Sequence, residues 1–172
     1  MKKILLTSLF ALATVISVGA HASESDQADG TARVKVRKAL KIQESQVMDF
    51  ATVTLGTGSS TVSIDNTGAV STTNNTYVPS GTGSAGSFDI VGPDSQALTV
   101  TYTDGTLANT SGDTIALTVD GVTGNATSVT TDSIGNANLT VVGNLAFTGN
   151  EPNDDYSTEN TSGVPYTVTV SY

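Results

Sequence analysis

The chain has 172 residues, a formal net charge of −9, one histidine, and neither cysteine nor tryptophan. Such an acidic chain is a poor partner for nucleic acid, and a chain without cysteine has no disulfides, thiol nucleophiles or thiolate metal ligands. The length is sufficient for one domain with a large buried core, so we expect a single domain.

The first 22 residues have the pattern of a cleavable export signal. Lys2 and Lys3 give a basic start, residues 4–18 form an apolar run, and Ala20-His21-Ala22 is a small-x-small cleavage pattern. The apolar run is too short for a stable membrane span. We therefore expect cleavage after Ala22, which also removes the only histidine. The expected product is a bacterial protein of the periplasm, cell surface or extracellular medium, without a transmembrane segment.

A short acidic leader and a basic stretch follow the signal. Residues 23–30 lack large aliphatic side chains, and their composition predicts a disordered leader. The chain has seven Lys and Arg residues, and the five other than Lys2 and Lys3 all lie within residues 33–41. Basic and apolar residues alternate over residues 33–42, with only Lys38 and Ala39 out of phase. This pattern predicts a strand with one basic and one apolar face.

Short alternating runs separated by Gly, Asn and Asp continue to the end of the chain. They cover residues 48–55, 61–64, 87–91, 98–103, 114–119, 138–142, 145–148 and 166–172. Helical spacing is not sustained anywhere. The pattern predicts an all-β fold for residues 31–172, an antiparallel immunoglobulin-like β-sandwich of about eight to ten strands. A closed barrel is the second choice.

A polar stretch, residues 151–163, is longer than a normal hairpin connection, and we expect it to lie outside the sandwich. Oxygen ligands suit calcium, and this stretch holds five candidates for a calcium site: Glu151, Asn153, Asp154, Asp155 and Glu159. A solvated acidic loop is the alternative interpretation. We expect no other cofactor.

Enzyme chemistry is unfavourable once the signal is removed. Histidine and cysteine, the usual general base and thiol nucleophile, are then absent. Paired carboxylates could still hydrolyse glycosides, but among sixteen Asp and Glu residues chance pairs are common, and there is no Trp to line a sugar cleft. We predict a non-enzymatic protein without catalytic residues.

Five segments, in order, match a family pattern. They are residues 31–42, Val47-Met48-Asp49-Phe50, Thr61-Val62-Ser63-Ile64-Asp65 with Gly68-Ala69-Val70, Phe88-Asp89-Ile90-Val91-Gly92, and residues 166–172. Together they resemble the bacterial secreted proteins of domain-of-unknown-function family 4402 (DUF4402). Ala51 stands where relatives usually have glycine, and residues 151–163 are longer than in relatives. The resemblance implies a secreted β-sandwich, often found near surface or fimbria-like systems, and implies no catalytic residues.

The first and last strands are the candidate partner-binding segments. A strand that ends the chain leaves backbone groups that must pair. One hypothesis is pairing within the domain, with residues 31–42. The other is strand exchange, in which the basic strand of one copy meets the acidic body of another. The candidate residues are Arg33, Val34, Lys35, Val36, Arg37, Lys38, Leu40, Ile42, Tyr166, Val168, Val170 and Tyr172.

Lys38 interrupts the apolar row and counts against strand exchange, unless it lies at a bulge or extends out to solvent. The basic residues would otherwise protect an exposed strand edge. We expect an exported, non-enzymatic surface structural protein, a fimbria-like self-assembling subunit that binds itself or another surface protein. The alternative is a monomeric secreted β-sandwich module that binds glycan or calcium. The oligomeric state distinguishes the two.

Overall fold

The structure is a computed structural model, and it describes residues 31–121 and 128–172. The expected signal (1–22) and acidic leader (23–30) lie outside the described residues. Residues Val36–Tyr172 cluster into one unit, and residues 31–35 belong to a separate unit. The account of the fold below concerns the unit that begins at Val36.

Twelve strands make up the regular structure of the described residues, and every pair among them is antiparallel. The same part of the chain has no helix. The prediction of an antiparallel all-β fold is therefore confirmed, with more strands than expected. The strands are β1 (Lys41–Gln46), β2 (Thr52–Thr54), β3 (Ser60–Ile64), β4 (Val70–Thr72), β5 (Val78–Ser80), β6 (Gly86–Val91), β7 (Ala97–Thr103), β8 (Gly105–Ala108), β9 (Thr114–Gly121), β10 (Ser128–Thr130), β11 (Asn136–Phe147) and β12 (Thr167–Ser171).

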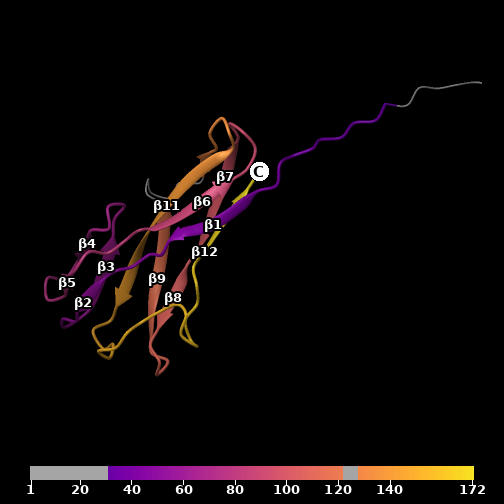
Figure 1. Cartoon of the computed structure of the whole chain (residues 1–172). Coiled ribbons are helices and arrows are strands. Elements are labelled where there is room, and N and C mark those ends of the chain that lie inside the picture. The colour runs from indigo at the N-terminus through magenta and orange to yellow at the C-terminus, as the bar shows by residue number, and fades with distance from the viewer. Residues whose placement is uncertain (1–30, 122–127) are drawn as a thin grey trace, which may run out of the picture. The chain divides into compact units, whose positions relative to one another are not determined.

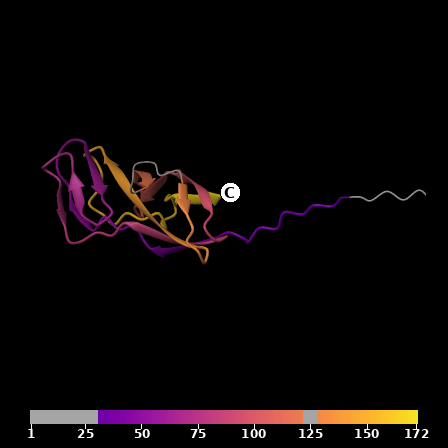
Figure 2. The same cartoon turned by 90° about the horizontal axis from the view of Figure 1, so that it is seen from above.

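The long strand β11 organises the largest sheet. Its first half pairs with β6 and its second half with β3, while β9 pairs along residues 141–146. Strand β1 extends this sheet beyond β6, β4 extends it beyond β3, and β8 extends it beyond β9. Two smaller sheets, β10-β7-β12 and β2-β5, complete the fold. In Figures 1 and 2, strands β2 to β5 gather at one end of this unit, and the C-terminus lies at the other.

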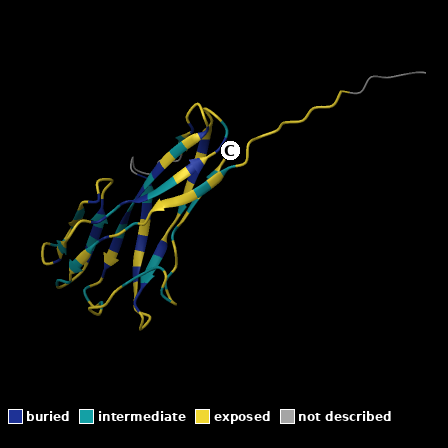
Figure 3. Ribbon diagram, in the orientation of Figure 1, coloured by how far each residue is buried: buried dark blue, intermediate teal, exposed yellow. Residues whose placement is uncertain are grey.

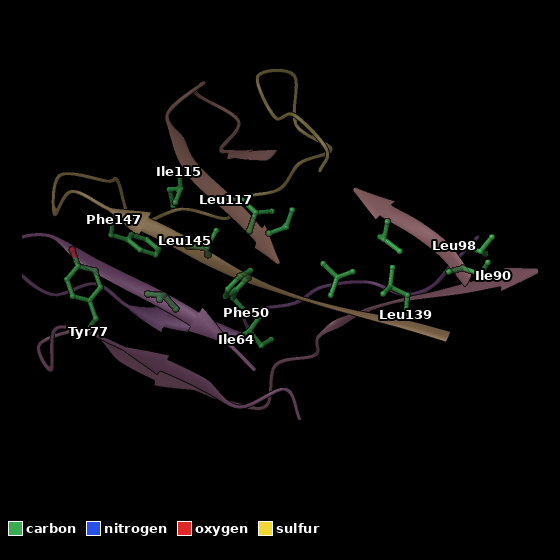
Figure 4. Close-up of a cluster of buried hydrophobic side chains, with 14 residues drawn as sticks. Phe50, Ile64, Tyr77, Ile90, Leu98, Ile115, Leu117, Leu139, Leu145 and Phe147 are labelled. Carbon is green, nitrogen blue, oxygen red and sulfur yellow. The ribbon is translucent and has the colours of Figure 1, made fainter. Parts of the chain in front are cut away.

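One cluster of buried side chains joins the sheets into a sandwich. Leu98 of β7 is 1% exposed and lies near Ile90 and Leu139 of the large sheet, whereas Phe50 and Tyr77 pack at the β2–β5 end (Figure 4). Strands β7, β9 and β11 bury alternate residues, as expected for sheets with one apolar and one polar face. The core therefore runs along the whole length of β11.

The predicted basic strand over residues 33–42 is wrong in its bounds. Residues 31–40 belong to no strand, and β1 begins only at Lys41. The partner strand explains this limit, because Lys41 pairs with Val91, the last residue of β6. Beyond it the Gly92 amide donates to the carbonyl of Gly135, and Pro93 has no N–H to donate. Basic and apolar side chains alternate before Lys41, but no strand of the described residues is placed to pair with them.

Three other predicted runs are corrected. Residues 138–142 and 145–148 form one continuous strand, β11, because Gly143 keeps the period of two instead of making a turn. A Cβ at Gly143 would lie 2.7 Å from the sulfur of Met48 and 3.0 Å from Leu117, so glycine here permits close packing. In the predicted run 48–55 only Thr52–Thr54 is a strand, because Ala51 has a positive φ of 53° that breaks the extended chain.

Candidate functional site

The N-terminal segment is defined here as residues 31–40. It forms no strand and joins no sheet, and it is exposed up to residue 39. Val34 and Val36 are each 85% exposed, the highest values among the large apolar residues that the structure describes. Every residue from 31 to 39 is exposed, as the yellow stretch of Figure 3 shows. An alternating series of apolar and basic side chains thus lies exposed and belongs to no sheet of the described residues.

The base of the segment is held at the C-terminal end of β12. The hydroxyl of Tyr172 donates to the carbonyl oxygen of Lys38, and the Arg37 guanidinium carbon lies 4.4 Å from the centroid of the Tyr172 ring. The Lys38 ammonium nitrogen lies 3.8 Å from a carboxylate oxygen of Asp94. Both partners of this pair are more than half exposed, so the pair contributes little stability. Lys38 therefore marks the point where the segment leaves the domain.

The terminal strand pairs within the domain, but not with the segment that we expected. Strand β12 pairs with β7, from Thr167 with Thr103 to Ser171 with Thr99. Its apolar residues Val168 and Val170 are partly buried against the core. The hypothesis that β12 pairs with residues 31–42 is therefore wrong, and β12 keeps one edge without a strand partner among the described residues.

Strand β1 and the residues beside it contact the core and Tyr166, which immediately precedes β12. Leu40 and Ile42 are partly buried against the core, and the Tyr166 hydroxyl donates to Glu44 at 3.3 Å. Burial, followed by the charge of Glu44, raises the pKa of the Tyr166 phenol above its ordinary value. Of the twelve predicted partner-binding residues, those from Leu40 onward are thus structural, and Arg37 and Lys38 anchor the segment. Residues 33–36 are exposed and belong to no strand.

Edge protection does not explain most of the basic residues. Arg33, Lys35, Arg37 and Lys38 all precede β1 and so lie on no strand edge. Lys41, at the first position of β1, is the single basic residue on a strand of the described chain. A different role is needed for the other four.

The five candidate calcium ligands do not come together. No group of three acidic side chains within residues 31–121 and 128–172 could hold a metal ion. Glu151 instead accepts hydrogen bonds from the Thr148 amide and hydroxyl and from the Gly149 amide, at 2.5 to 2.9 Å. Burial opposes the charged form of Glu151, but these bonds outweigh it and lower the pKa of the carboxyl. Its charge stabilises a turn.

The stretch 151–163 does not lie outside the sandwich, which corrects our expectation. Ser157 and Ala108 exchange backbone hydrogen bonds at 2.8 and 2.9 Å, and the Asn160 side-chain amide donates to the Ala108 carbonyl at 2.6 Å. Just beyond the stretch, Val164 and Thr106 exchange two more backbone bonds. The stretch therefore covers the outer edge of β8.

A groove of about 630 Å³ opens between β2, the loop 152–156, and the face of β8, β9 and β11. We name it the acidic groove. Its apolar lining is Met48, Phe50, Val53, Leu55, Leu107, Ile115, Leu145 and Phe147, and its charged lining is Asp49, Asp154 and Asp155. No basic residue lines it. Pockets of this volume accommodate small ligands or a short peptide segment.

Tyr156 reports the electrostatic character of the groove. Burial, and then the negative charges of Asp113, Glu151 and Asp154, raise the pKa of its phenol. Negative charge therefore gathers on the loop side of the groove, where a cation would be favoured. The sequence singled out Asp154 and Asp155, but it suggested them as calcium ligands and not as part of a groove. The apolar floor was missed because its residues come from segments spread between positions 48 and 147.

In the described part of the chain, no helix is both long enough and apolar enough to cross a membrane. Residues 40–172 match the sequence profile of a family described as a domain of unknown function, DUF4402. None of the curated proteins or solved structures compared with the chain matches it. The profile match spans well over half of the sequence and confirms the resemblance that the ordered motifs suggested. The chain belongs to the DUF4402 family.

Proposed function

We propose that the protein is an exported, non-enzymatic structural subunit of the bacterial surface that assembles with copies of itself through its N-terminal segment. The observation that carries the proposal is the exposure of Val34 and Val36, 85% each, in a stretch that pairs with no strand. Fully burying one valine is worth about 1.5–3 kcal/mol. Covering both in a partner therefore supplies a driving force that the isolated chain does not use.

An unpaired extended segment is well suited to strand addition. In this mode of recognition, backbone hydrogen bonds provide affinity, and alternate side chains fill pockets on the acceptor. The segment offers Val34 and Val36 on one side and Arg33, Lys35 and Arg37 on the other if it remains extended. Lys38, the residue that interrupts the apolar row, lies at the anchor with Asp94 and so outside the part that would be donated.

Opposite charges favour contact between two copies. Of the sixteen Asp and Glu residues, thirteen remain when Glu24, Asp26 and Asp29 are set aside, and all thirteen follow Lys41. No Lys or Arg follows Lys41. A basic segment meeting the acidic body of a second copy gains long-range attraction, which speeds encounter and is weakened by salt.

Export and the absence of catalysis rest on the sequence. The pattern of residues 1–22 supports export, and the chain beyond it has no histidine or cysteine for general-base or thiol chemistry. A structural role requires a stable fold and a binding segment, and the exposed residues 33–36 are our candidate for the second.

The test is the oligomeric state of the chain that begins at Ser23. We expect sedimentation to show species that grow with protein concentration. Deleting residues 23–36, of which the described residues 31–36 contribute to no strand, should leave a folded monomer. In the full-length chain, Val34→Asp with Val36→Asp should do the same.

The matched control is Val47→Asp with Ile134→Asp, which changes two other exposed apolar residues, 67% and 68% exposed, by the same charge. This control should assemble like the parent. A parent protein that remains monomeric at all concentrations refutes the proposal and favours the monomeric binding module. Assembly that persists after the deletion also refutes it.

A further inference from the structure

We infer that the acidic groove receives residues 33–36 of a second copy, so that subunits join head to tail. The inference rests on the proposed function, because it identifies the surface on which the N-terminal segment of a neighbour would dock. Its acceptor residues lie on β2, on the loop 152–156 and on the second half of β11.

Strand β2 offers backbone groups to an incoming strand. It pairs with β5 through three residues, Thr52 to Thr54, and has no second strand partner among the described residues. Thr52 and Val53 line the groove. An extended segment laid in the groove can therefore pair with β2 while its side chains reach the floor.

The chemistry of the groove matches the alternation of the segment. Its apolar lining includes the partly exposed Val53, Leu55 and Leu107, which would contact Val34 and Val36 of the incoming copy. The basic side chains at positions 33 and 35 would then point away from the floor, toward the acidic rim. The chain contains only one stretch in which basic and apolar residues alternate in this way.

The rim supplies the complementary charges. Asp154 and Asp155 are exposed at the mouth of the groove, and Asp49 lies on the β2 side. A basic segment there gains attraction at the low dielectric of a partly buried site. The raised pKa of Tyr156, caused first by its burial and then by neighbouring carboxylates, fits the same negative surroundings.

The segment of the same molecule is too short to fill the groove. Lys38 is fixed at the far end of the fold, where its ammonium nitrogen lies 3.0 Å from the position that a Cβ at Gly135 would take. Gly135 precedes β11, and the groove residue Leu145 lies nine positions after Asn136 on that strand, about 30 Å at the rise of a strand. Val36 is two residues from Lys38, which allows a reach of only about 7 Å.

The occupant is therefore another copy. Lys38 lies beside Tyr172 and Asp94, whereas the groove lies at β2 and the loop 152–156, so such docking makes a contact between two different surfaces. Such heterologous contacts produce rings if the rotation closes and open filaments if it does not. This geometry suits a fimbria-like subunit.

Charge reversal and charge exchange test the inference in the full-length chain. The first variant, Asp154→Lys with Asp155→Lys, reverses the rim and should abolish concentration-dependent assembly. Its matched control, Asp89→Lys with Glu159→Lys, changes the net charge equally at exposed positions outside the groove, and should assemble like the parent. The second variant, Arg33→Glu with Lys35→Glu, should fail to assemble. Combining it with the reversed rim should restore assembly, because the charges are then exchanged between the partners.

Three results overturn the inference. If the reversed rim assembles like the parent while the deletion of residues 23–36 does not, the groove is not the acceptor, although the proposed function stands. A charge exchange that restores nothing also contradicts the pairing. If the deletion variant itself assembles, the proposed function fails and the inference fails with it. Circular dichroism melting of each variant distinguishes lost assembly from lost folding.

Discussion

The hydroxyl of Tyr172, the last residue of the chain, donates a hydrogen bond to the backbone carbonyl of Lys38, where the N-terminal segment leaves the domain. The ring of the same tyrosine lies under the guanidinium of Arg37. The Tyr172 side chain therefore connects the N-terminal part of the domain to its C-terminal residue. It contacts residues 37 and 38, just after the exposed residues 33–36.

Tyr172→Phe removes this hydrogen bond and keeps the ring near Arg37. A net hydrogen bond contributes about 0.5–1.5 kcal/mol, and because Tyr172 is 44% exposed we expect a loss of unfolding free energy near the lower limit. NMR order parameters of residues 38–40 should fall, while those of β11 stay unchanged. Order parameters at residues 38–40 equal to those of the parent would contradict the anchoring role.

The core and the N-terminal segment should respond differently to truncation of an apolar side chain. Leu98 is 1% exposed, so Leu98→Ala should lower the unfolding free energy by about 2–5 kcal/mol. Val36→Ala, at an exposed position, should change it by no more than about 0.5 kcal/mol. Urea denaturation of the monomeric protein measures both. A large loss in Val36→Ala would show that the segment belongs to the folded core.

Ala51 adopts a conformation that favours glycine. Its φ is 53°, and the Asp49 carboxylate holds the turn by accepting a hydrogen bond from the Ala51 amide at 2.8 Å. The left-handed region costs an L-residue about 1–2 kcal/mol. Replacing Ala51 with glycine removes this cost. Part of the gain is offset, because glycine loses more conformational entropy on folding, which costs about 0.5–1 kcal/mol.

Ala51→Gly should therefore raise the unfolding free energy by about 0.5–1 kcal/mol. The matched control is Ala116→Gly on β9, an extended and exposed position where the same change should destabilise. Thermal melting compares the two variants. If Ala51→Gly destabilises as much as the control, the positive φ carries no strain.

Two carboxylates predict how stability depends on pH. Asp65 accepts hydrogen bonds from the Thr67 hydroxyl and from the Thr67 and Ala69 amides, and Asp132 accepts them from the Asn136 and Ile134 amides. These bonds, led by the Thr67 hydroxyl for Asp65 and the Asn136 amide for Asp132, lower each pKa below its ordinary value of 3.8. A depressed pKa in the folded state gives stability that is present above 3.8 and is lost as the pH falls through the folded pKa.

We therefore expect the double variant Asp65→Asn with Asp132→Asn to be less stable than the parent at neutral pH. The difference should shrink as the pH falls below the ordinary aspartate pKa. Melting temperatures recorded from neutral to strongly acidic pH measure it. A difference that stays constant across this range would show that the two charges do not support their turns.

Strands that bury alternate side chains were the predictable part of the fold. The runs at residues 61–64, 87–91 and 98–103 became β3, β6 and β7 with nearly the expected bounds. Strands of three residues, such as β4 and β10, are too short for a period of two to be recognised. A period of two describes where side chains point, and it does not show whether a neighbouring strand is available for pairing. The alternation before Lys41 therefore predicted a strand where no described strand pairs.

The candidate site was predictable only in part. The sequence singled out the basic residues that the structure leaves unpaired, and it singled out Asp154 and Asp155. The groove itself depends on Phe50, Leu107 and Phe147 meeting across three parts of the chain, and on the loop 152–156 packing beside β8. A local sequence pattern cannot predict these contacts, because they depend on the order of the strands and on the position of the loop.

Head-to-tail donation is tested most directly by mixing two variants that each lack one partner surface. One lacks residues 23–36 and keeps the acidic groove, and the other keeps the N-terminal segment and carries Asp154→Lys with Asp155→Lys. Analytical ultracentrifugation of each alone should show a monomer, and an equimolar mixture should form a one-to-one heterodimer that grows no further. If the mixture remains monomeric under conditions in which the parent assembles, the segment of one copy does not dock in the groove of another.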